Sequence, residues 1–518
     1  MPTFNTPRAR PVNDRPPARD RAYVLYWMQA YRRLDRNHAL DYAVAAAKAW
    51  AKPLVVYEGL RLDYPWASGR HHAFMLEGMA ANAKAAKMLG VNYWPFVETP
   101  DRPARGLLRK LAANACLVVT DDYPAFIVPG QTAALADRVD VPVTAVDGNS
   151  LVPLAHLGPA VSAAAHLRPR IHKAFADAWA HRAAAEPDLP QPLRTKIDPP
   201  FEPWDPSVKV DAFIGGLPID QSVGRVPGVT GGCVAGRKVL ATFLADKLPR
   251  YGEGRNAPDD PDATAQSRLS PYLRHGHVSI QEVAEGVLGD DWEPGMLNPA
   301  QRGKREGYFH PDANVNSFLD EALTWRDVGY HWHYRRNEAL GARAAEWKAV
   351  DGVKVPAYFD LASTLPEWAK ATLTKHAKDS REFTYSLGEW EAATTHDELW
   401  NAAQKELVAT GRIHNYLRML WGKKVLEWSR TPEEAYLVLE HLNNKYAIDG
   451  RDPNSYTGVL WTFGLFDRPW APERPVFGTV RFMSSGNTAK KFKLDGYYEY
   501  VERVTNPGRP RAGLGLFG

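Results

Sequence analysis

Residues 411–428 read GRIHNYLRMLWGKKVLEW, and their pattern indicates one helix that organises the C-terminal half of the chain. At about 100° per residue, one face of this helix carries an amide, a guanidinium, a thioether and a gap where a flat ligand could approach. These positions are Asn415, Arg418, Met419 and Gly422. The adjacent face carries Trp421, Val425 and Trp428, and core packing is the simpler interpretation of that face.

Arg418 is harder to explain by packing, because it stands on an inward-facing stripe of the expected helix. A buried guanidinium needs a carboxylate or a ligand anion as its partner. Asp449, in the segment DGRDPN at 449–454, is the candidate carboxylate. The pattern therefore predicts an ion pair or an anion site at this helix.

The sequence around this helix is also helical, and strand signals are absent beyond residue 210. Thr431-Pro432-Glu433-Glu434 is a typical helix start, with proline early and acids in the first turn. Helical periodicity covers residues 231–248, 279–288, 317–336, 396–411, 413–428 and 432–443. We therefore expect an all-α C-terminal domain.

The N-terminal part alternates strands and helices instead. Short apolar runs at 23–27, 54–57, 93–97, 116–120 and 143–146 are separated by helical stretches that include 72–89. This alternation predicts a parallel five-stranded, Rossmann-like α/β sheet. No glycine-rich turn follows the first strand, so no dinucleotide site is assigned there. Asp121 and Asp122, which end the fourth strand, are interpreted as solvated loop acids rather than catalytic groups.

Composition limits the class of protein. The chain has 518 residues, a net charge of +4, 17 Trp and only two cysteines, Cys116 and Cys233. These numbers exclude a disulfide framework and a cysteine metal site, favour a reducing compartment, and permit nucleic-acid binding without demanding it. No apolar run of about 18 residues is present, so we expect no membrane span.

The expected domains are a disordered basic tail at 1–20, an α/β domain at 21–155, an interdomain linker at 156–210, a helical domain at 211–505 and a loose tail at 506–518.

Several long segments resemble the class II deoxyribodipyrimidine photolyases of the photolyase/cryptochrome family. They are HDELWNAAQKELVATGRIHNYLRMLWGKKVLEW at 396–428, LNNKYAIDGRDPNSYTGVLW at 442–461, RPVFGTVRFM at 474–483, RAYVLYWMQAYRRLDRNHAL at 21–40 and SRLSPYLRHGHVS at 267–279. The resemblance runs from about residue 20 to about residue 500. It implies an antenna-type α/β domain followed by an FAD- and DNA-binding helical domain.

The resemblance also implies cofactor contacts. In the family, FAD is U-shaped within the helical domain. Residues that match positions at its phosphates are Tyr251, Ser267, Leu269 and Ser270, although Ser270 could be a simple helix N-cap. Asn415 and Arg418 match flavin-contacting positions, and Asp449 matches the partner of Arg418. Asn443 matches the asparagine that faces flavin N5, with Asn454 as a second candidate.

The substrate and redox residues follow in the same way. Positions that match the lesion pocket are Glu321, Trp325, Met419, Trp461 and Trp470. Trp400, Trp421 and Trp428 match the tryptophan chain that photoreduces FAD. Candidate phosphate contacts at the cavity mouth are Lys423, Lys424, Arg481, Lys490, Lys491 and Lys493.

The implied function is light-driven repair of cyclobutane pyrimidine dimers, catalysed by a carbon–carbon lyase through an electron from excited reduced FAD. The implied partner is damaged double-stranded DNA with a flipped dimer. We expect a monomer, located in the cytoplasm with the nucleoid in a prokaryote or in the nucleus of a eukaryote. A second, antenna chromophore such as a deazaflavin is a further expectation, and no residue pattern fixes its identity.

Two segments depart from the family pattern and leave alternatives open. Residues 273–276 read LRHG where the family usually has a Leu-His-Phe-Gly run, and residues 326–333 replace an acidic Arg-Glu-Leu run. Because we expect these changes near the flavin pocket, a cryptochrome-like photoreceptor without repair and a (6-4) photoproduct photolyase remain alternatives. His331 and His333 could suggest a metal, but no third ligand stands at a clear spacing.

Overall fold

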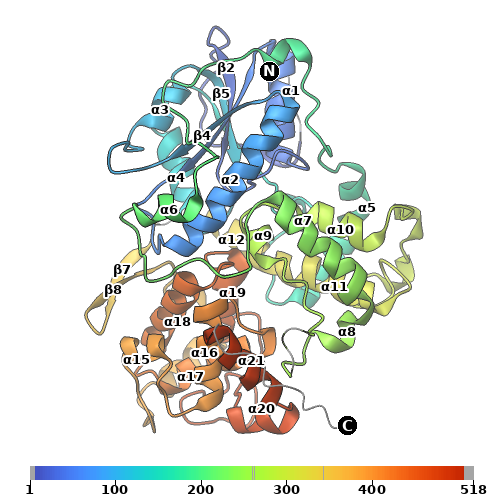
Figure 1. The fold of residues 1–518 in the computed structure, drawn as a ribbon. Coiled ribbons are helices and arrows are strands. Elements are labelled where there is room, and N and C mark those ends of the chain that lie inside the picture. Colours follow the sequence, from blue (N-terminus) through green and yellow to red (C-terminus); the bar gives the residue numbers. More distant parts are fainter. Residues whose placement is uncertain (1–5, 260, 262, 342–343, 507–518) are drawn as a thin grey trace, which may run out of the picture. The chain divides into compact units, whose positions relative to one another are not determined.

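The computed structural model describes residues 6–259, 261, 263–341 and 344–506 (Figure 1). The chain forms two compact units. Unit 1 comprises Met1–Pro249, Ser267–Ala344 and Asp452–Asn454, and unit 2 comprises Arg250–Gln266, Ala345–Arg451 and Ser455–Gly518. This division differs from the domain limits expected from the sequence, because segments distant in the chain belong to one unit.

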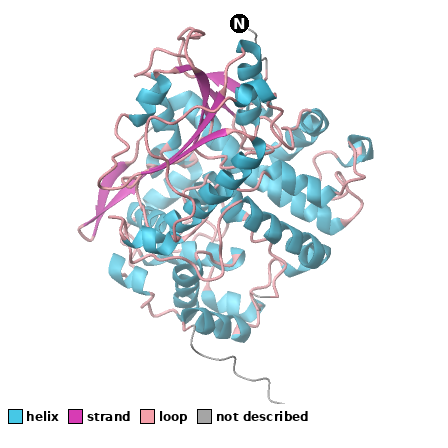
Figure 2. Ribbon diagram, turned by 45° about the horizontal axis from the view of Figure 1, so that its top comes forward, coloured by secondary structure: helices cyan, strands magenta, loops and turns pink. Residues whose placement is uncertain are grey.

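Unit 1 contains a six-stranded sheet with the order β1-β6-β5-β2-β3-β4 (Figure 2). The strands are β1 (Ala9–Pro11), β2 (Tyr23–Met28), β3 (Leu54–Leu60), β4 (Asn92–Val97), β5 (Ala115–Asp121) and β6 (Val143–Val146). The five strands from β2 to β6 are parallel, as predicted, and β1 is antiparallel to β6.

Strand β1 contradicts the prediction of a disordered tail for residues 9–11. This strand pairs with the edge strand β6, and the guanidinium of Arg8 donates hydrogen bonds to the carbonyls of Asp147 (3.1 Å) and Ser150 (3.0 Å). Residues 1–5 and 507–518 of the expected tails lie outside the described residues.

Helices cover both faces of the sheet. On one face, α1 (His38–Trp50) packs against β2, β5 and β6, and the Asn37 side chain caps its first turn. On the other face, Tyr23, Leu25 and Trp27 pack with residues of α3 (Leu107–Ala112) and α4 (Val128–Ala136). The long helix α2 (Gly69–Leu89) contacts β4. The strands are buried on both faces, which is why they read as continuous apolar runs.

Unit 1 contains further helices. They are α5 (Ala164–Ala180), α6 (Val210–Gly215), α7 (Cys233–Thr242), α9 (Ser270–Arg274), α10 (Ile280–Leu288), α11 (Ala313–Leu319) and α12 (Arg326–Leu340). Two segments are π-helical turns, η3 (Phe243–Lys247) and η7 (Asp320–Trp325). The short 3₁₀ turns are η1 (Leu154–Leu157), η2 (Gln191–Arg194), η4 (Leu248–Arg250), η5 (Pro294–Met296) and η6 (Pro299–Gln301). Helix α5 corrects the expectation of a linker over 156–210, because Leu167, Ile171 and Phe175 bury its apolar stripe.

Unit 2 is helical apart from one hairpin. Its helices are α8 (Tyr251–Gly254), α13 (Leu361–Thr364), α14 (Glu367–Lys375), α15 (Leu387–Ala392), α16 (Glu398–Thr410), α17 (Asn415–Trp428), α18 (Pro432–Tyr446), α20 (Ser485–Lys491) and α21 (Asp495–Thr505), together with α19 (Pro453–Trp461) from Ser455 onward. The helices expected at 396–411, 413–428 and 432–443 are confirmed as α16, α17 and α18.

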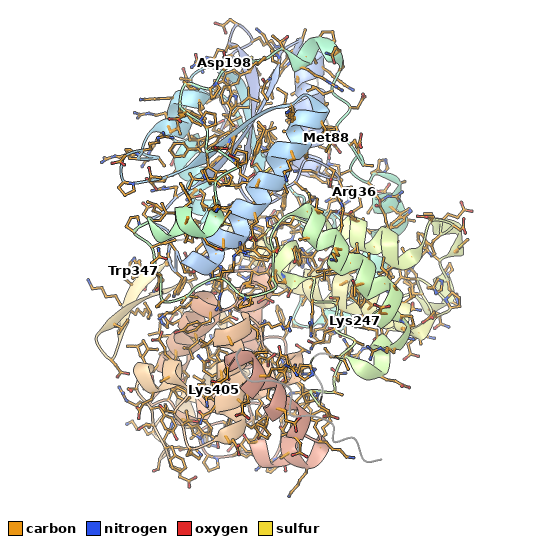
Figure 3. The ribbon with its side chains drawn as sticks, viewed as in Figure 1. Arg36, Met88, Asp198, Lys247, Trp347 and Lys405 are labelled. Carbon is orange, nitrogen blue, oxygen red and sulfur yellow. The ribbon has the colours of Figure 1, made fainter. Side chains whose placement is uncertain are left out.

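The hairpin of β7 (Glu346–Val350) and β8 (Val353–Ala357) corrects the all-α expectation for unit 2. On this hairpin the Trp347 side chain is 61% exposed (Figure 3). Within the described part of the chain, no helix combines the length and the apolarity that crossing a membrane requires.

Candidate functional site

A buried acid fixes the start of helix α17. Glu406 of α16 is 1% exposed and accepts hydrogen bonds from Tyr497 Oη (2.8 Å) and from the backbone N–H of His414 (3.3 Å). Burial raises the pKa of its carboxyl, while these donors and Arg412 oppose the rise. The sequence analysis missed Glu406. Its position could have indicated a buried acid, because Glu406 stands seven residues after Leu399 on the same apolar face of α16.

The predicted pair on α17 is present. Arg418 Nη2 lies 3.4 Å from Asp449 Oδ1, and the two side chains are 30% and 13% exposed. Asn443, near the end of α18, is buried beside the same turn. A Cβ added to Gly450 would lie only 2.8 Å from the backbone oxygen of Asn443, so the turn approaches the helix closely. Asp449 therefore pairs with Arg418, and the turn that follows Asp449 packs against the backbone of Asn443.

The two faces of α17 differ in exposure, and this difference bears on the flavin prediction. Asn415 is exposed, and Arg418 and Met419 are half-buried, so the predicted ligand face is partly open. At Gly422, however, a Cβ would meet Thr462 Oγ1 at 2.6 Å. Gly422 therefore permits close packing of Thr462, and the expected gap for a flat ligand at this position is wrong.

The residues expected at the FAD phosphates are divided between the units. In unit 2, Tyr251 is the first residue of α8, it is buried, and the Arg255 guanidinium lies 5.4 Å from its ring centroid. In unit 1, the backbone N–H of Leu269 points to Ser267 Oγ (3.4 Å), and Leu269 is the cap residue of α9. Ser270 is exposed and lies inside the helix, so its interpretation as an N-cap is wrong.

The predicted lesion acid and tryptophan, Glu321 and Trp325, lie on the π-helical turn η7 rather than on a regular helix. Glu321 is half-buried, and Trp325 is 38% exposed despite its size. A buried ion pair holds this turn, with Arg168 Nε 2.6 Å from Asp320 Oδ1. Single π-turns within helices are frequent at functional sites, because they redirect the side chains that they carry.

The other predicted lesion tryptophans, Trp461 and Trp470, lie in one cationic cluster of unit 2. Arg481 stacks on Trp470, with 4.0 Å between the guanidinium carbon and the ring centroid, and lies 5.7 Å from the ring of Trp461. Asp467 accepts hydrogen bonds from Arg481 Nε (2.8 Å) and Trp470 Nε1 (3.1 Å). Burial would raise the pKa of Asp467, but these donors hold it below its ordinary value.

Two lysines expected at DNA phosphates are buried instead. Lys423 is 0% exposed and donates a hydrogen bond from Nζ to the carbonyl of Thr462 (2.6 Å). Lys424 is 6% exposed and pairs with Glu427. Lys423 is fully buried, and Lys424 is nearly so, with its ammonium paired to Glu427, so neither lysine is an exposed phosphate contact as predicted. The exposed candidates are Lys490, Lys491 and Lys493.

The predicted tryptophan chain is only partly continuous. The rings of Trp421 and Trp400 are parallel within 5°, with centroids 6.5 Å apart. Both rings are buried, and Trp400 Nε1 donates to the carbonyl of Trp421 (3.1 Å). Within the described residues, Trp400 and Trp428 make no ring contact with each other, whereas Trp390 contacts both. Sequence comparison with the family did not single out Trp390.

Asp121, at the carboxyl end of β5, has a structural role. It is 1% exposed and accepts hydrogen bonds from the backbone N–H groups of Gln29 (2.9 Å), Ala30 (2.6 Å) and Tyr31 (2.9 Å). Asp122 pairs with Arg10 at 2.7 Å. The interpretation of both as solvated loop acids is wrong, because the loop after β2 and strand β1 supply partners that the local sequence does not show.

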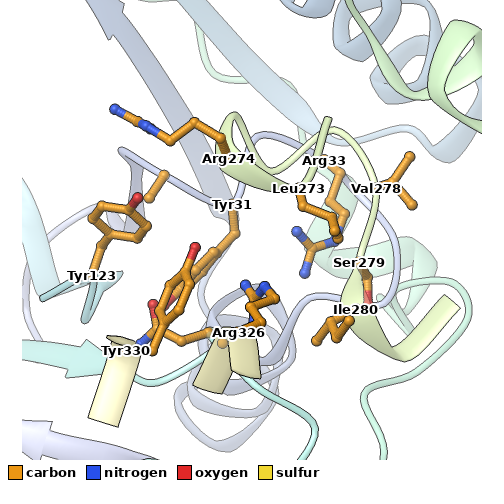
Figure 4. A pocket seen from close by; sticks show the side chains of 13 residues that line it. Tyr31, Arg33, Tyr123, Leu273, Arg274, Val278, Ser279, Ile280, Arg326 and Tyr330 are labelled. Atoms are coloured by element: carbon orange, nitrogen blue, oxygen red, sulfur yellow. The ribbon is translucent and has the colours of Figure 1, made fainter. Parts of the chain in front are cut away.

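A small pocket in unit 1 opens where the chain leaves β2, β5 and β6, which is the point where the strand order reverses (Figure 4). Its lining includes Tyr31, Arg33, Tyr123, Arg274, Arg326 and Tyr330. Tyr330 Oη donates to Asp452 (2.6 Å), and the Arg326 guanidinium carbon lies 4.0 Å from the Tyr330 ring centroid.

The two segments that depart from the family pattern both contribute to this pocket, through Arg274 and through Arg326 and Tyr330. Gly276 follows Arg274 at φ +69°, and a Cβ there would lie 2.1 Å from the Ala30 carbonyl oxygen. The altered segment is therefore tightly packed against the loop after β2, and its side chains line the pocket of unit 1.

His331 and His333 are buried in unit 1, and burial lowers their pKa values to about 4 and about 3. His331 Nε2 lies 2.8 Å from the carbonyl oxygen of Gly158. In the portion of the chain that the structure describes, no group of three or more His, Cys, Asp or Glu side chains is arranged to hold a metal ion.

Comparison with known proteins now bears on this geometry. The chain is 34% identical over 507 residues to a deoxyribodipyrimidine photo-lyase of Methanothermobacter thermautotrophicus, an alignment that covers 96% of this chain and 98% of that protein. It is 30% identical over 498 residues to a deoxyribodipyrimidine photo-lyase of Potorous tridactylus, with 95% and 84% covered. No family model matches the chain.

Solved structures share the fold. A bacterial class III photolyase from Agrobacterium tumefaciens aligns with a TM-score of 0.60 at 18% identity, over 95% of this chain and 90% of that one. An archaeal photolyase from Sulfolobus tokodaii with two FAD molecules aligns with a TM-score of 0.54 at 15% identity, over 93% of each chain. The chain has the photolyase/cryptochrome fold and belongs to the deoxyribodipyrimidine photo-lyase family of enzymes.

Proposed function

We propose that this protein is a class II photolyase that uses light to split cyclobutane pyrimidine dimers in DNA. The observation that carries the proposal is the Arg418–Asp449 pair on the partly open face of α17, beside buried Asn443. The long motifs at 396–428, 442–461 and 474–483 resemble this class. Both relatives compared above carry the name deoxyribodipyrimidine photo-lyase.

The donor set of unit 2 fits the polar edge of FAD. Arg418 supplies a charged donor that Asp449 orients, and Asn443 supplies an amide with both a donor and an acceptor. When bound and reduced, FAD supplies the light-excited electron that opens the dimer. Asn415, Arg418, Asp449 and Asn443 bind and orient the cofactor, and we assign Tyr251, Ser267, Leu269 and Ser270 to its phosphates.

The lesion residues supply flat walls and one polar group. Base-flipping enzymes, photolyases among them, hold an extruded base between apolar rings. By resemblance to the family we assign Trp325, Trp461, Trp470 and Met419 to the lesion pocket. The 38% exposure of Trp325 leaves its ring accessible for stacking. We assign Glu321 to a pyrimidine carbonyl, to which its carboxyl group in the protonated form would donate a hydrogen bond as negative charge develops on the opening dimer.

The pocket of unit 1 is the proposed site of a second, light-harvesting chromophore. Its tyrosine rings and three guanidinium groups, from Arg33, Arg274 and Arg326, favour a flat ligand that carries negative charge. The Sulfolobus tokodaii photolyase, with its two FAD molecules, is the precedent for a second chromophore in this fold. A deazaflavin is the proposed ligand.

The proposed partner is double-stranded DNA with a flipped dimer, contacted at its phosphates by the exposed lysines Lys490, Lys491 and Lys493. We further propose that the protein acts as a monomer in the compartment that holds the genome.

A repair assay tests this function. The purified protein is reduced and illuminated with blue light on an oligonucleotide that carries one cyclobutane dimer, and restored bases are counted. We expect Trp325→Ala to weaken binding of the damaged strand by about 5- to 150-fold, because base stacking contributes about 1–3 kcal/mol. The matched control is Trp347→Ala, which removes another exposed tryptophan. Intact dimers after illumination of the unaltered, reduced protein would refute the proposal.

The same assay separates the two alternatives. Repair of an oligonucleotide with a (6-4) photoproduct, without repair of the cyclobutane dimer, would favour a (6-4) photolyase. A flavin spectrum that responds to light without repair of either lesion would favour a cryptochrome-like photoreceptor.

A further inference from the structure

Trp390 of α15 lies between two of the tryptophans assigned to flavin photoreduction. Its ring centroid is 4.8 Å from that of Trp400, with the planes at 63°. It is 6.1 Å from that of Trp428, with the planes within 13° of parallel. Trp400 in turn stacks on Trp421. The rings therefore form the continuous series Trp421, Trp400, Trp390 and Trp428, all within unit 2.

The surroundings of Trp390 suit a residue that passes an electron on. Its side chain is 0% exposed, and its Nε1–H has no hydrogen-bond acceptor among the described residues. Trp400 Nε1 donates only to a backbone carbonyl, which is a very weak base. An oxidised indole loses its N–H proton readily only to a base. Trp390 and Trp400 therefore keep their protons when oxidised and remain able to accept an electron from the next ring.

The series ends at a residue that can lose a proton. Tyr385 contacts both Trp390 (5.1 Å between ring centroids) and Trp428 (5.9 Å). A hydrogen bond joins Tyr385 Oη to His396 Nδ1, and the backbone N–H of His396 donates to the same Oη (3.0 Å). His396 is exposed. Oxidation of a phenol releases its proton, and His396 provides an acceptor that exchanges with solvent.

We propose that Trp390 is an electron-transfer residue that connects Trp400 both to Trp428 and directly to Tyr385. This inference rests on the proposed function, because the oxidant is the photoexcited oxidised flavin of that site. One electron leaves Trp421 for the flavin, and Trp400 and then Trp390 replace the missing electron in turn.

The residue at the outer end of the series supplies the last electron. Either Trp428 or Tyr385 supplies the electron that Trp390 has lost. When Tyr385 supplies it, the phenolic proton moves to His396 Nδ1, which leaves a neutral tyrosyl radical. An added thiol then returns one electron and one proton to that radical, so one thiol is oxidised for each electron delivered to the flavin.

Two variants of the full-length flavoprotein test the proposal. Trp390→Phe keeps an aromatic ring of similar shape but removes the oxidisable indole. We expect it to lower the yield of blue-light flavin reduction with thiol by about tenfold or more, equivalent to about 1.4 kcal/mol in the rate-limiting hop. We expect Trp428→Phe to lower the yield less than Trp390→Phe does, because Tyr385 contacts Trp390 directly and can supply the electron in place of Trp428. Trp292→Phe, at another buried tryptophan, is the matched control.

Time-resolved absorption and electron paramagnetic resonance provide a readout that a packing defect would not change. In Trp428→Phe the long-lived radical is expected on tyrosine, and in Trp390→Phe no radical is expected beyond Trp400. If Trp390→Phe photoreduces like the control, the proposal is wrong. If Trp390→Phe does not fold, the radical formed in Trp428→Phe is the test. A long-lived tyrosyl radical supports the link, and the absence of a tyrosyl radical refutes it.

A separate measurement tests the proposed function. Trp390→Phe that has been reduced chemically with dithionite bypasses the tryptophan series, and its repair of a cyclobutane dimer is measured under the same light. If the chemically reduced Trp390→Phe repairs the dimer and Trp390→Phe also photoreduces normally, only the proposed role of Trp390 is refuted. Absence of repair in the chemically reduced, unaltered protein defeats the proposed function.

Discussion

The buried lysine beside Trp461 makes a prediction that the structure allows us to quantify. Lys423 is 0% exposed, its ammonium donates to the Thr462 carbonyl, and it lies 4.5 Å from the Trp461 ring centroid. Burial lowers its pKa from 10.5 to about 7, although Asp467 opposes the change. The unfolded chain keeps the ordinary lysine pKa.

The sign of the pH dependence follows from proton counting. Between pH 7 and about 10.5, the unfolded chain holds the Lys423 proton and the folded protein has released it. Because the unfolded state binds more protons, the free energy of unfolding rises with pH in this window, by at most about 1.4 kcal/mol per pH unit. From pH 7 to pH 9 the contribution of Lys423 amounts to about 2 kcal/mol, since the group is half-titrated at pH 7.

Urea denaturation, followed by circular dichroism at several pH values between 7 and 9, measures this contribution. Lys423→Met keeps the length and apolar stem of the side chain but removes the titrating group. We expect the stability of the unaltered protein, relative to this variant, to rise by about 2 kcal/mol across that range. Lys490→Met, at an exposed lysine, should leave the pH dependence unchanged. A constant difference between the unaltered protein and Lys423→Met would refute the reasoning.

Three further substitutions test other parts of the structure. Asp449→Asn removes the anionic partner of Arg418, so we expect flavin retention after gel filtration to fall by about tenfold, or about 1.4 kcal/mol, whereas Asp449→Glu should restore part of it. Hydrogen bonds from His441 and Lys445 lower the pKa of Glu391 to about 2 against the rise from burial, so Glu391 stabilises the fold above pH 4.5 and this stabilisation is lost as the pH falls toward 2. Urea titrations at pH 6 and pH 3 measure this loss of stability. After allowance for the partial exposure of Glu391, Glu391→Gln should reduce the difference in unfolding free energy between the two pH values by about 1–2 kcal/mol. The same difference in the variant and the unaltered protein would contradict this prediction. Asp121→Ala leaves three backbone N–H groups without their acceptor. We therefore expect the free energy of unfolding, measured by thermal denaturation, to fall by about 3 kcal/mol or more. An unchanged melting temperature would show that these hydrogen bonds do not stabilise the fold.

Several features of the site follow directly from the sequence. A 3.6-residue period places Arg418 and Asn415 on one face of a helix, and the need of a half-buried guanidinium for a partner selects a nearby acid. The structure confirms that Asp449 is that acid. The five parallel strands were equally predictable, because strands buried on both faces read as apolar runs separated by helical stretches.

Other features could not be predicted from local patterns. Gly422 stands on the predicted ligand face, yet Thr462, forty residues later in the chain, fills the space beside it. Lys423 resembles a surface cation in the sequence, and only the packing of the segment that follows Trp461 buries it. In both cases the deciding neighbour, Thr462, comes from a segment that is distant in the sequence, the turn after α19.

The sequence by itself determined the alternation of strands and helices, the orientation of α17 and the family to which the chain belongs, because periodicity and long motifs are properties of contiguous residues. Only the tertiary structure decided that Trp390 bridges Trp400 and Trp428, and that Arg274 and Arg326 line one pocket. The physical reason is that distances between residues far apart in the chain depend on how helices and loops pack against one another, which no local period encodes.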